Sequence, residues 1–158
     1  MQCAVGLLLC MLFSGTIYGE ATEERIARSY RQAVAGDKSA VEHCLELLEL
    51  IVSQEPQNQL ARAYLGSCYT LRSRDMSFGL AKLHTLNHGL ALMDQAVASA
   101  PEDPQVRLVR ARTTDALPAF LGRARQSRED FSWLVQVARR TPERFTAEDL
   151  AAIRQHGR

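Results

Sequence analysis

The sequence has little of what many functional classes of protein require. Its net charge is +1, so no chain-wide attraction draws it to nucleic acid or to an anionic membrane. Its nine glycines all occur singly, which excludes a glycine-rich loop that cradles phosphate. It has four cysteines but no CxxC pair, which argues against a zinc or thiol-redox motif. These absences leave shape and surface, more than motif chemistry, as the source of function.

No group of residues predicts a catalytic or metal site. His84 and His88 are four residues apart, a spacing that can hold a metal ion on one helix, but Asp94 lies too far along the same segment to complete the site. We interpret them as surface or groove histidines. Serine, histidine and aspartate occur without the pattern of a triad, and Leu65–Cys68 is not a G-x-S-x-G elbow. The sequence therefore predicts no enzyme, no cofactor and no metal.

Long hydrophobic runs are also lacking, except for one at the N-terminus. The run 4–13 is ten residues long, too short for a helix to cross about 30 Å of hydrocarbon. Small and polar residues follow it, so we predict a secretory signal peptide over 1–19, cleaved after Gly19, although no Lys or Arg precedes the run. An uncleaved anchor and a buried first helix are the alternatives. Cleavage would leave a secreted or periplasmic bacterial protein with no membrane span.

Removal of that leader would leave two cysteines, Cys44 and Cys68. Both fall on predicted helices at the spacing of the apolar face, so we interpret them first as small buried side chains. In an exported protein they could instead form a disulfide bond if their Cα atoms lie within about 7 Å. The sequence leaves both alternatives open.

Apolar residues recur at helical spacing along most of the chain. Val41, Leu45, Leu48 and Val52 follow one another at intervals of four, three and four residues, which is typical of an amphipathic helix. No segment alternates with a period of two, so we predict an all-α fold in a single domain over 20–158. Helices are expected at 22–35, 39–53, 60–72, 105–116 and around 131–138. A long helix that carries Leu83 to Val97 is expected to end at Ala100, and a last helix to follow a Thr146 cap. An exposed bend is expected at 122–127.

Prolines divide these helices at nearly regular intervals. Pro56, Pro101 and Pro142 are separated by 45 and 41 residues, and each interval holds two helices. Such a period is typical of an α-solenoid, because one helix pair cannot bury both of its faces and stacked pairs can. We therefore predict a short solenoid of about three antiparallel helix pairs plus a C-terminal helix.

The central segment, 60–101, carries the residues of a known repeat. Leu65, Gly66 and Tyr69 form L-G-x-x-Y, and Ala96 and Pro101 form A-x4-P. Together they resemble the tetratricopeptide repeat (TPR). The resemblance implies that the glycine lets two helices approach closely, that the tyrosine fills the space beside it, and that the alanine faces the next helix.

The resemblance extends over about 23–142 but is strong only in the central unit. Arg62 stands where the family usually has a tryptophan, and the small residue of the second helix, Gly89, comes later than in the family. The extra residues, 72–84, either lengthen both helices or form a local loop. The chain also looks similar to uncharacterised exported bacterial proteins with degenerate repeats, a likeness that implies no function.

Arginines recur in the central and third units, and two interpretations compete. A solvated basic face is the plain one. The functional one is a carboxylate clamp on the inner wall of the repeat array, since a planar guanidinium makes two parallel bonds to one carboxylate. We expect a protein- or peptide-binding scaffold with no nucleic-acid partner. The repeat register predicts which side chains face the inner wall and contact the bound protein or peptide: Ser67, Thr70, Arg74, Leu108, Arg112 and Asp115.

The alternative function is the binding of a small ligand or solute. The insertion 72–84 and the segment 117–122 would then shape a closed pocket, with Tyr64, Phe78 and Phe120 as its apolar lining. An enclosed pocket at the insertion favours this alternative, and an open groove favours peptide binding.

Overall fold

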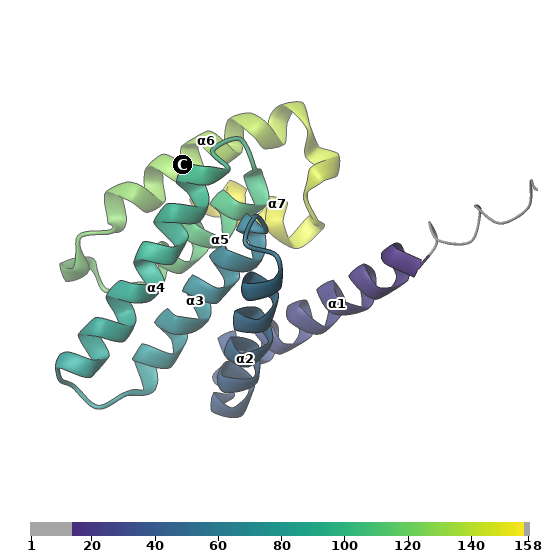
Figure 1. Cartoon of the computed structure of the whole chain (residues 1–158). Coiled ribbons are helices and arrows are strands. Elements are labelled where there is room, and N and C mark those ends of the chain that lie inside the picture. The colour runs from purple at the N-terminus through teal and green to yellow at the C-terminus, as the bar shows by residue number, and fades with distance from the viewer. Residues whose placement is uncertain (1–13, 157–158) are drawn as a thin grey trace, which may run out of the picture.

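A computed structural model describes residues 14–156, with side chains from residue 24 onward, and over this range the chain is all-α without a strand (Figure 1). The first helix, α1 (Ser14–Val34), begins before the predicted start at residue 22 and continues through Gly19. Most of the predicted signal peptide, 1–13, lies outside the described residues. None of the helices within the described range is long and apolar enough to cross a membrane.

Consecutive helices pack side by side, and alternate helices share a layer. After α1 the elements are α2 (Lys38–Gln54), α3 (Gln59–Asp75), α4 (Leu80–Ser99), α5 (Pro104–Asp115), the short η1 (Ala119–Leu121), α6 (Ala124–Arg140), the short η2 (Pro142–Arg144) and α7 (Ala147–His156). Each of α1, α2, α3 and α4 packs on the helix that follows it, and α5 packs on α6, while α1, α3 and α5 also contact one another in turn. The last helix, α7, packs on α6.

Proline and short polar side chains set the ends of these helices. The helices α2, α4 and α6 each end two residues before Pro56, Pro101 and Pro142, since a residue that precedes proline avoids helical backbone angles. Asp37 and Asp103 then cap the starts of α2 and α5 by accepting hydrogen bonds from backbone N–H groups. The regular proline spacing thus corresponds to real helix ends.

The helices α3 and α4 cross in backbone contact at two glycines. A Cβ atom added to Gly66 would lie 2.5 Å from the carbonyl oxygen of Gly89, and one added to Gly89 would collide with the carbonyl oxygen of Gly66. The Cβ of Tyr69 would lie 2.9 Å from that second added atom, so the tyrosine stands beside the crossing. Ala96, fully buried, packs with Val106 of α5, the next helix. The two glycines thus let α3 and α4 approach to backbone contact.

The insertion 72–84 lengthens both central helices. The helix α3 continues to Asp75 and α4 starts at Leu80, so only residues 76–79 form the turn between them. The ammonium group of Lys82 donates to the carbonyl oxygens of Arg74 and Met76, at 3.3 and 3.1 Å, and holds this turn against the start of α4. Of the two predicted alternatives, the structure shows the first.

The exposed bend predicted at 122–127 is wrong beyond Arg123. Gly122 has left-handed backbone angles (φ 71°), which fit a turn, but α6 starts at Ala124. Ser127 is 1% exposed, and its hydroxyl lies 3.3 Å from the carbonyl oxygen of Ala111. The polar sequence of this segment reflects a first helical turn that packs on α5.

The predicted cap of the last helix is confirmed. The backbone N–H of Asp149 donates to the Thr146 hydroxyl oxygen at 3.1 Å, and the Asp149 carboxylate accepts from the Thr146 backbone N–H at 3.1 Å. These two reciprocal hydrogen bonds form a capping box, in which Thr146 precedes the first residue of α7 and Asp149 is the carboxylate three residues after Thr146.

Candidate functional site

The inner wall predicted to bind a peptide is closed at its centre. Ser67, Thr70 and Leu108 are only 2%, 5% and 2% exposed. Ser67 lies between α1 and α5, Thr70 faces Gly89 of α4, and Leu108 packs in a core cluster with residues of α6 and α7. The expectation that these three side chains line an open groove is therefore wrong.

Their polar atoms are satisfied inside the protein. The Ser67 hydroxyl lies 2.8 Å from the Tyr30 hydroxyl of α1 and 2.8 Å from the Thr113 hydroxyl of α5. Burial raises the pKa of Tyr30 to about 12, so its phenol stays neutral. Thr70 donates to the carbonyl oxygen of Ser67 at 2.7 Å. This chain of hydroxyl groups joins α1, α3 and α5.

The two predicted residues near the end of α5 are paired with the chain's own last helix. The guanidinium of Arg112 lies 2.8 Å from the Glu148 carboxylate and 3.3 Å from that of Asp149. Asp115 lies 2.9 Å from Nδ1 of His156. Arg112 therefore grips carboxylates, as a clamp would, but they belong to α7, which covers this part of α5.

Arg74, the sixth predicted residue, lies apart from the others, near the C-terminal end of α3. Its side chain is 44% exposed and its nearest acidic partner is Asp75, at 3.6 Å. The six residues thus do not form one surface: three are buried, two pair with α7, and one is exposed beside the turn 76–79.

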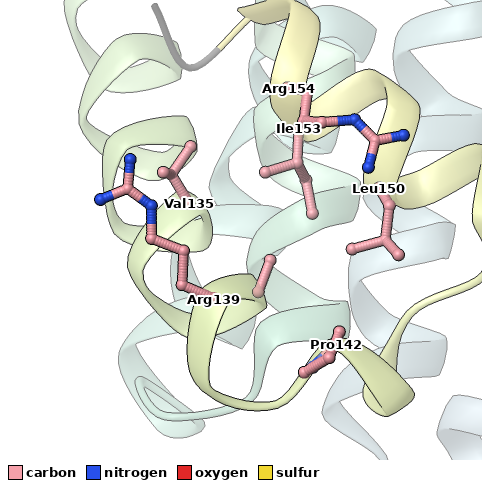
Figure 2. A pocket seen from close by; sticks show the side chains of 7 residues that line it. Val135, Arg139, Pro142, Leu150, Ile153 and Arg154 are labelled. Carbon is pink, nitrogen blue, oxygen red and sulfur yellow. The ribbon is translucent and has the colours of Figure 1, made fainter.

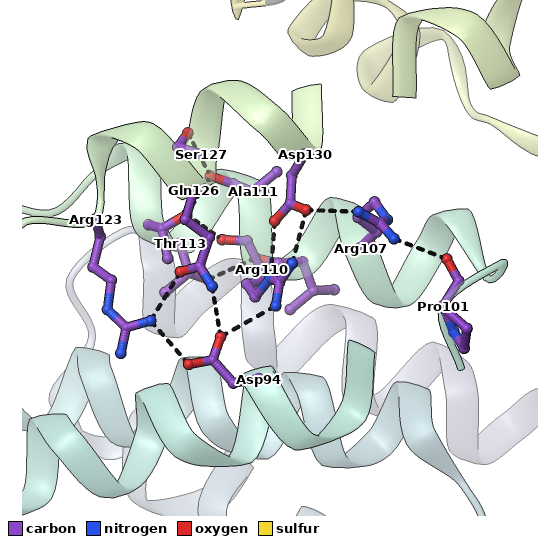
Figure 3. Close-up of polar contacts among 12 residues, drawn as sticks. Asp94, Pro101, Arg107, Arg110, Ala111, Thr113, Arg123, Gln126, Ser127 and Asp130 are labelled. Carbon is purple, nitrogen blue, oxygen red and sulfur yellow. Dashed lines mark hydrogen bonds and ion pairs between the residues drawn. The ribbon is translucent and has the colours of Figure 1, made fainter. Parts of the chain in front are cut away.

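Several other arginines are turned into the protein, where they join α4, α5 and α6 (Figure 3). Arg110 makes two hydrogen bonds of 2.8 Å to the carboxylate of Asp130 and one of 3.1 Å to Asp94. Arg107 donates to Asp130 at 3.1 Å and stacks over the Trp133 ring, 4.4 Å from its centroid. For these arginines the interpretation as a solvated basic face is wrong.

Asp94 extends this network to the start of α6. Its carboxylate accepts from Arg123 at 2.9 Å and from the amide of Gln126 at 2.7 Å, besides Arg110. Burial alone would lower the pKa of Arg110, but the hydrogen bonds and charges of the two aspartates outweigh it and raise that pKa. Every carboxylate oxygen in the network has a donor, so the network holds three helices together.

The two histidines of α4 are both exposed, and His88 stands edge-on to the ring of Tyr69. Within the described residues, no group of three or more His, Cys, Asp or Glu side chains is arranged to hold a metal ion.

Large apolar side chains are exposed around the start of α4. Phe78 and Leu80 are 90% and 86% exposed, Leu83 is 40% exposed, and Phe120 of η1 is 86% exposed. We call these four residues the apolar end. Phe120 is included because its neighbours Leu117 and Leu121 pack on Leu86, Leu90 and Met93 of α4, and Leu86 lies one turn beyond Leu83. The pocket predicted around the insertion is wrong, because two of its three lining residues point into solvent.

A separate pocket lies between α6 and α7 (Figure 2). It has a volume of about 470 Å³ and an apolar lining of Val135, Ala138, Pro142, Leu150 and Ile153. Arg139 and Arg154 flank it, one from each helix. Among the described residues neither arginine has an acidic partner, which leaves two positive charges beside an apolar floor.

No protein-family model, curated protein or solved structure matches the chain. The chemistry of the apolar end and of the pocket is therefore what indicates function.

The apolar end offers the larger gain on binding. A fully buried Phe or Leu side chain contributes about 1.5–3 kcal/mol relative to an exposed one, and the apolar end presents four such residues. The pocket between α6 and α7 is already lined by side chains that pack on one another, so only a small ligand fits there. The sequence named Phe78 and Phe120 as apolar residues of a binding site, but it placed them inside a closed pocket rather than on an exposed surface, and it did not include Leu80 or Leu83.

Proposed function

We propose that the chain is an exported, TPR-like helical-repeat protein that binds a segment of another protein at the apolar end. The exposure of Phe78, Leu80 and Phe120 carries this proposal. Aromatic and large aliphatic side chains that contact solvent together are typical of binding surfaces, where they supply most of the binding energy.

The packing of the helices supports the repeat. Helices α1, α3 and α5 share one layer, and each is followed by a helix that packs against it. The crossing of α3 and α4 at Gly66 and Gly89 has the close approach that the TPR family requires of its glycine. For export, the support is the short apolar run at 4–13 with the small and polar residues that follow it.

The charges beside the apolar end indicate the chemistry of the partner. Residues 72–84 contain three cations and one anion. Arg72 pairs with Glu42 of α2 and Arg74 with Asp75, and Lys82 has no carboxylate partner within the described residues. The segment that holds Phe120 is followed by Arg125, which is 84% exposed and lies 3.7 Å from Glu129. The partner segment should therefore be an amphipathic helix whose apolar face is flanked by Asp or Glu, since opposite charges at the rim speed and orient association.

Defined peptides can test this proposal. We expect a labelled peptide helix with a leucine face and glutamate flanks to bind the full chain, measured by fluorescence anisotropy, and the same peptide with lysine flanks to bind at least tenfold more weakly. The variant Phe78→Ser/Leu80→Ser should weaken the first peptide at least tenfold, because both side chains are exposed and their loss leaves the fold intact. Leu50→Ser, at a half-exposed leucine on α2 away from the apolar end, is the control and should bind as the wild type does.

Other occupants of the apolar end would contradict the proposal. Binding of anionic lipid vesicles, lost in Phe78→Ser/Leu80→Ser while no peptide binds, would assign the surface to a membrane. A concentration-dependent dimer that the same variant abolishes would assign it to a second copy of the chain. If Phe78→Ser/Leu80→Ser and Leu50→Ser bind the glutamate-flanked peptide with equal affinity, the apolar end is not the binding surface.

A second candidate function, the binding of a small anionic ligand, is favoured by the pocket between α6 and α7. Its apolar floor and the guanidinium groups of Arg139 and Arg154 suit a short acyl chain that ends in a carboxylate. We expect Arg139→Ala/Arg154→Ala to abolish binding of a medium-chain fatty acid in isothermal titration calorimetry. Arg128→Ala, an exposed arginine on α6 outside the pocket lining, is the control. Absence of heat with the wild type would contradict this candidate and leave the apolar end untouched.

A further inference from the structure

Two cysteine side chains meet in the core between α2 and α3. The sulfur atoms of Cys44 and Cys68 lie 2.9 Å apart, and neither residue has any exposed surface. This distance is within about 1 Å of the ~2.05 Å length of a disulfide bond. Leu45, Leu48 and Leu65 belong to the same core cluster, so the two sulfurs are enclosed by packed side chains.

We propose that Cys44 and Cys68 form a disulfide bond that joins α2 to α3. The two thiols lose two protons and two electrons, and the electrons reduce an external disulfide, either of a protein or of a small thiol, to two thiols. One cysteine thiolate attacks the external disulfide and releases the first thiol as a mixed disulfide forms. The second cysteine thiolate then displaces the other thiol and closes the Cys44–Cys68 bond.

The burial of the pair determines when this reaction takes place. An external disulfide cannot reach either sulfur in the packed core. Exchange therefore occurs only while α2 and α3 are apart, before they pack during folding or after they separate on unfolding. Cys68 donates a hydrogen bond to the sulfur of Cys44, which lowers the pKa of Cys44, while that bond and burial raise the pKa of Cys68. Once made, the bond is protected from reductants until the protein unfolds.

The bond would constrain the unfolded chain. The cysteines are 24 residues apart in sequence, so the bond closes a loop that contains the end of α2, the Pro56 turn and the first half of α3. A loop of this size raises the melting temperature of a chain of this length by on the order of 10 °C. Cytosolic thiols stay reduced, so the bond belongs to an exported form of the chain. The inference stands independently of what the apolar end binds.

Tryptic digestion can reveal the bond directly, because Arg62 separates the two cysteines into peptides 39–62 and 63–72. The full chain should be refolded with oxidised glutathione, denatured in iodoacetamide without reductant, and digested. We expect a single species that contains both peptides and is two hydrogens lighter than their sum. Two separately alkylated peptides, or cysteines carrying only glutathione, would overturn the proposal.

Thermal melting of the wild type supplies a second measurement, with a cysteine-free core as its control. A denaturing treatment with dithiothreitol, followed by refolding with the reductant present, should lower the melting temperature of the wild type by on the order of 10 °C. Dithiothreitol added to the folded protein should have no effect until the protein is unfolded. Cys44→Ala/Cys68→Ala should melt near the reduced wild type and be insensitive to the reductant. An identical melting temperature for the oxidised and reduced wild type would overturn the bond as a structural element.

Discussion

Gly66→Leu should leave the chain without a cooperative unfolding transition. The new Cβ alone would lie 2.5 Å from the carbonyl oxygen of Gly89 and 2.8 Å from Cγ of Met93. The methionine side chain can move, but the carbonyl oxygen is part of the backbone of α4. The two helices must therefore separate, and their separation exposes core residues along both. Overpacking usually costs about 1–3 kcal/mol when side chains can adjust, and here the loss should exceed that range.

Circular dichroism during urea titration measures this effect. Ala91→Leu adds a leucine at an exposed position of α4 and should unfold as the wild type does, which separates the loss of space from the change of residue. Gly66→Ala should be intermediate, because it places only the Cβ against the carbonyl oxygen. Near-native stability of Gly66→Leu would show that α3 and α4 do not cross at this residue.

Much of the helical framework could be predicted from the sequence, because local features determine it. Pro56, Pro101 and Pro142 end helices through the backbone restrictions of proline itself. The apolar spacing of Val41, Leu45 and Leu48 determines which face of α2 is buried, and all three are buried. Such signals act within one or two helical turns and need no knowledge of the rest of the fold.

Contacts between distant segments could not be predicted in the same way. Arg112 meets Glu148, which is 36 residues away, and Arg123 meets Asp94, which is 29 residues away. Many acidic and basic residues were available, and their pairing depends on how α4, α5, α6 and α7 are stacked. The predicted peptide-binding wall was wrong at Ser67, Thr70 and Leu108 for the same reason: the repeat position of a residue does not show how closely the neighbouring helices approach.

The binding surface also depends on distant packing. Phe78 and Phe120 are separated in sequence by α4 and α5, and the sequence placed both inside a closed pocket. Leu117 and Leu121 instead pack on Leu86 and Leu90 of α4, and Phe120 between them is exposed. The insertion 72–84, which was predicted to shape a pocket, is instead an extension of two helices that carries apolar residues into solvent.

Asp130→Ala should reduce the free energy of unfolding by about 3–5 kcal/mol. The carboxylate is 1% exposed and accepts hydrogen bonds from Arg110 and Arg107, whose side chains are only 12% and 18% exposed. Its removal leaves two guanidinium groups in the protein without their main anion, and an uncompensated buried charge is costly. Arg107 is the more vulnerable of the two, because its buried Nε atom has no hydrogen-bond partner within the described residues.

The emission of Trp133 offers a direct probe of this unfolding. It is the single tryptophan of the chain and lies against Arg107, so its fluorescence in urea reports the separation of α5 from α6. Glu129→Ala, at an exposed neighbouring position, should leave stability within about 0.5 kcal/mol of the wild type.

The cause of the loss can be separated from the loss itself. If the orphaned charge of Arg110 is responsible, Asp130→Leu with Arg110→Met should be more stable than Asp130→Leu alone, because an apolar pair can replace a buried ion pair at little cost. A double variant less stable than the single one would instead show that Arg110 stabilises the protein mainly through Asp94. The network would then act as the link between α4 and α5 rather than as the anchor of α6.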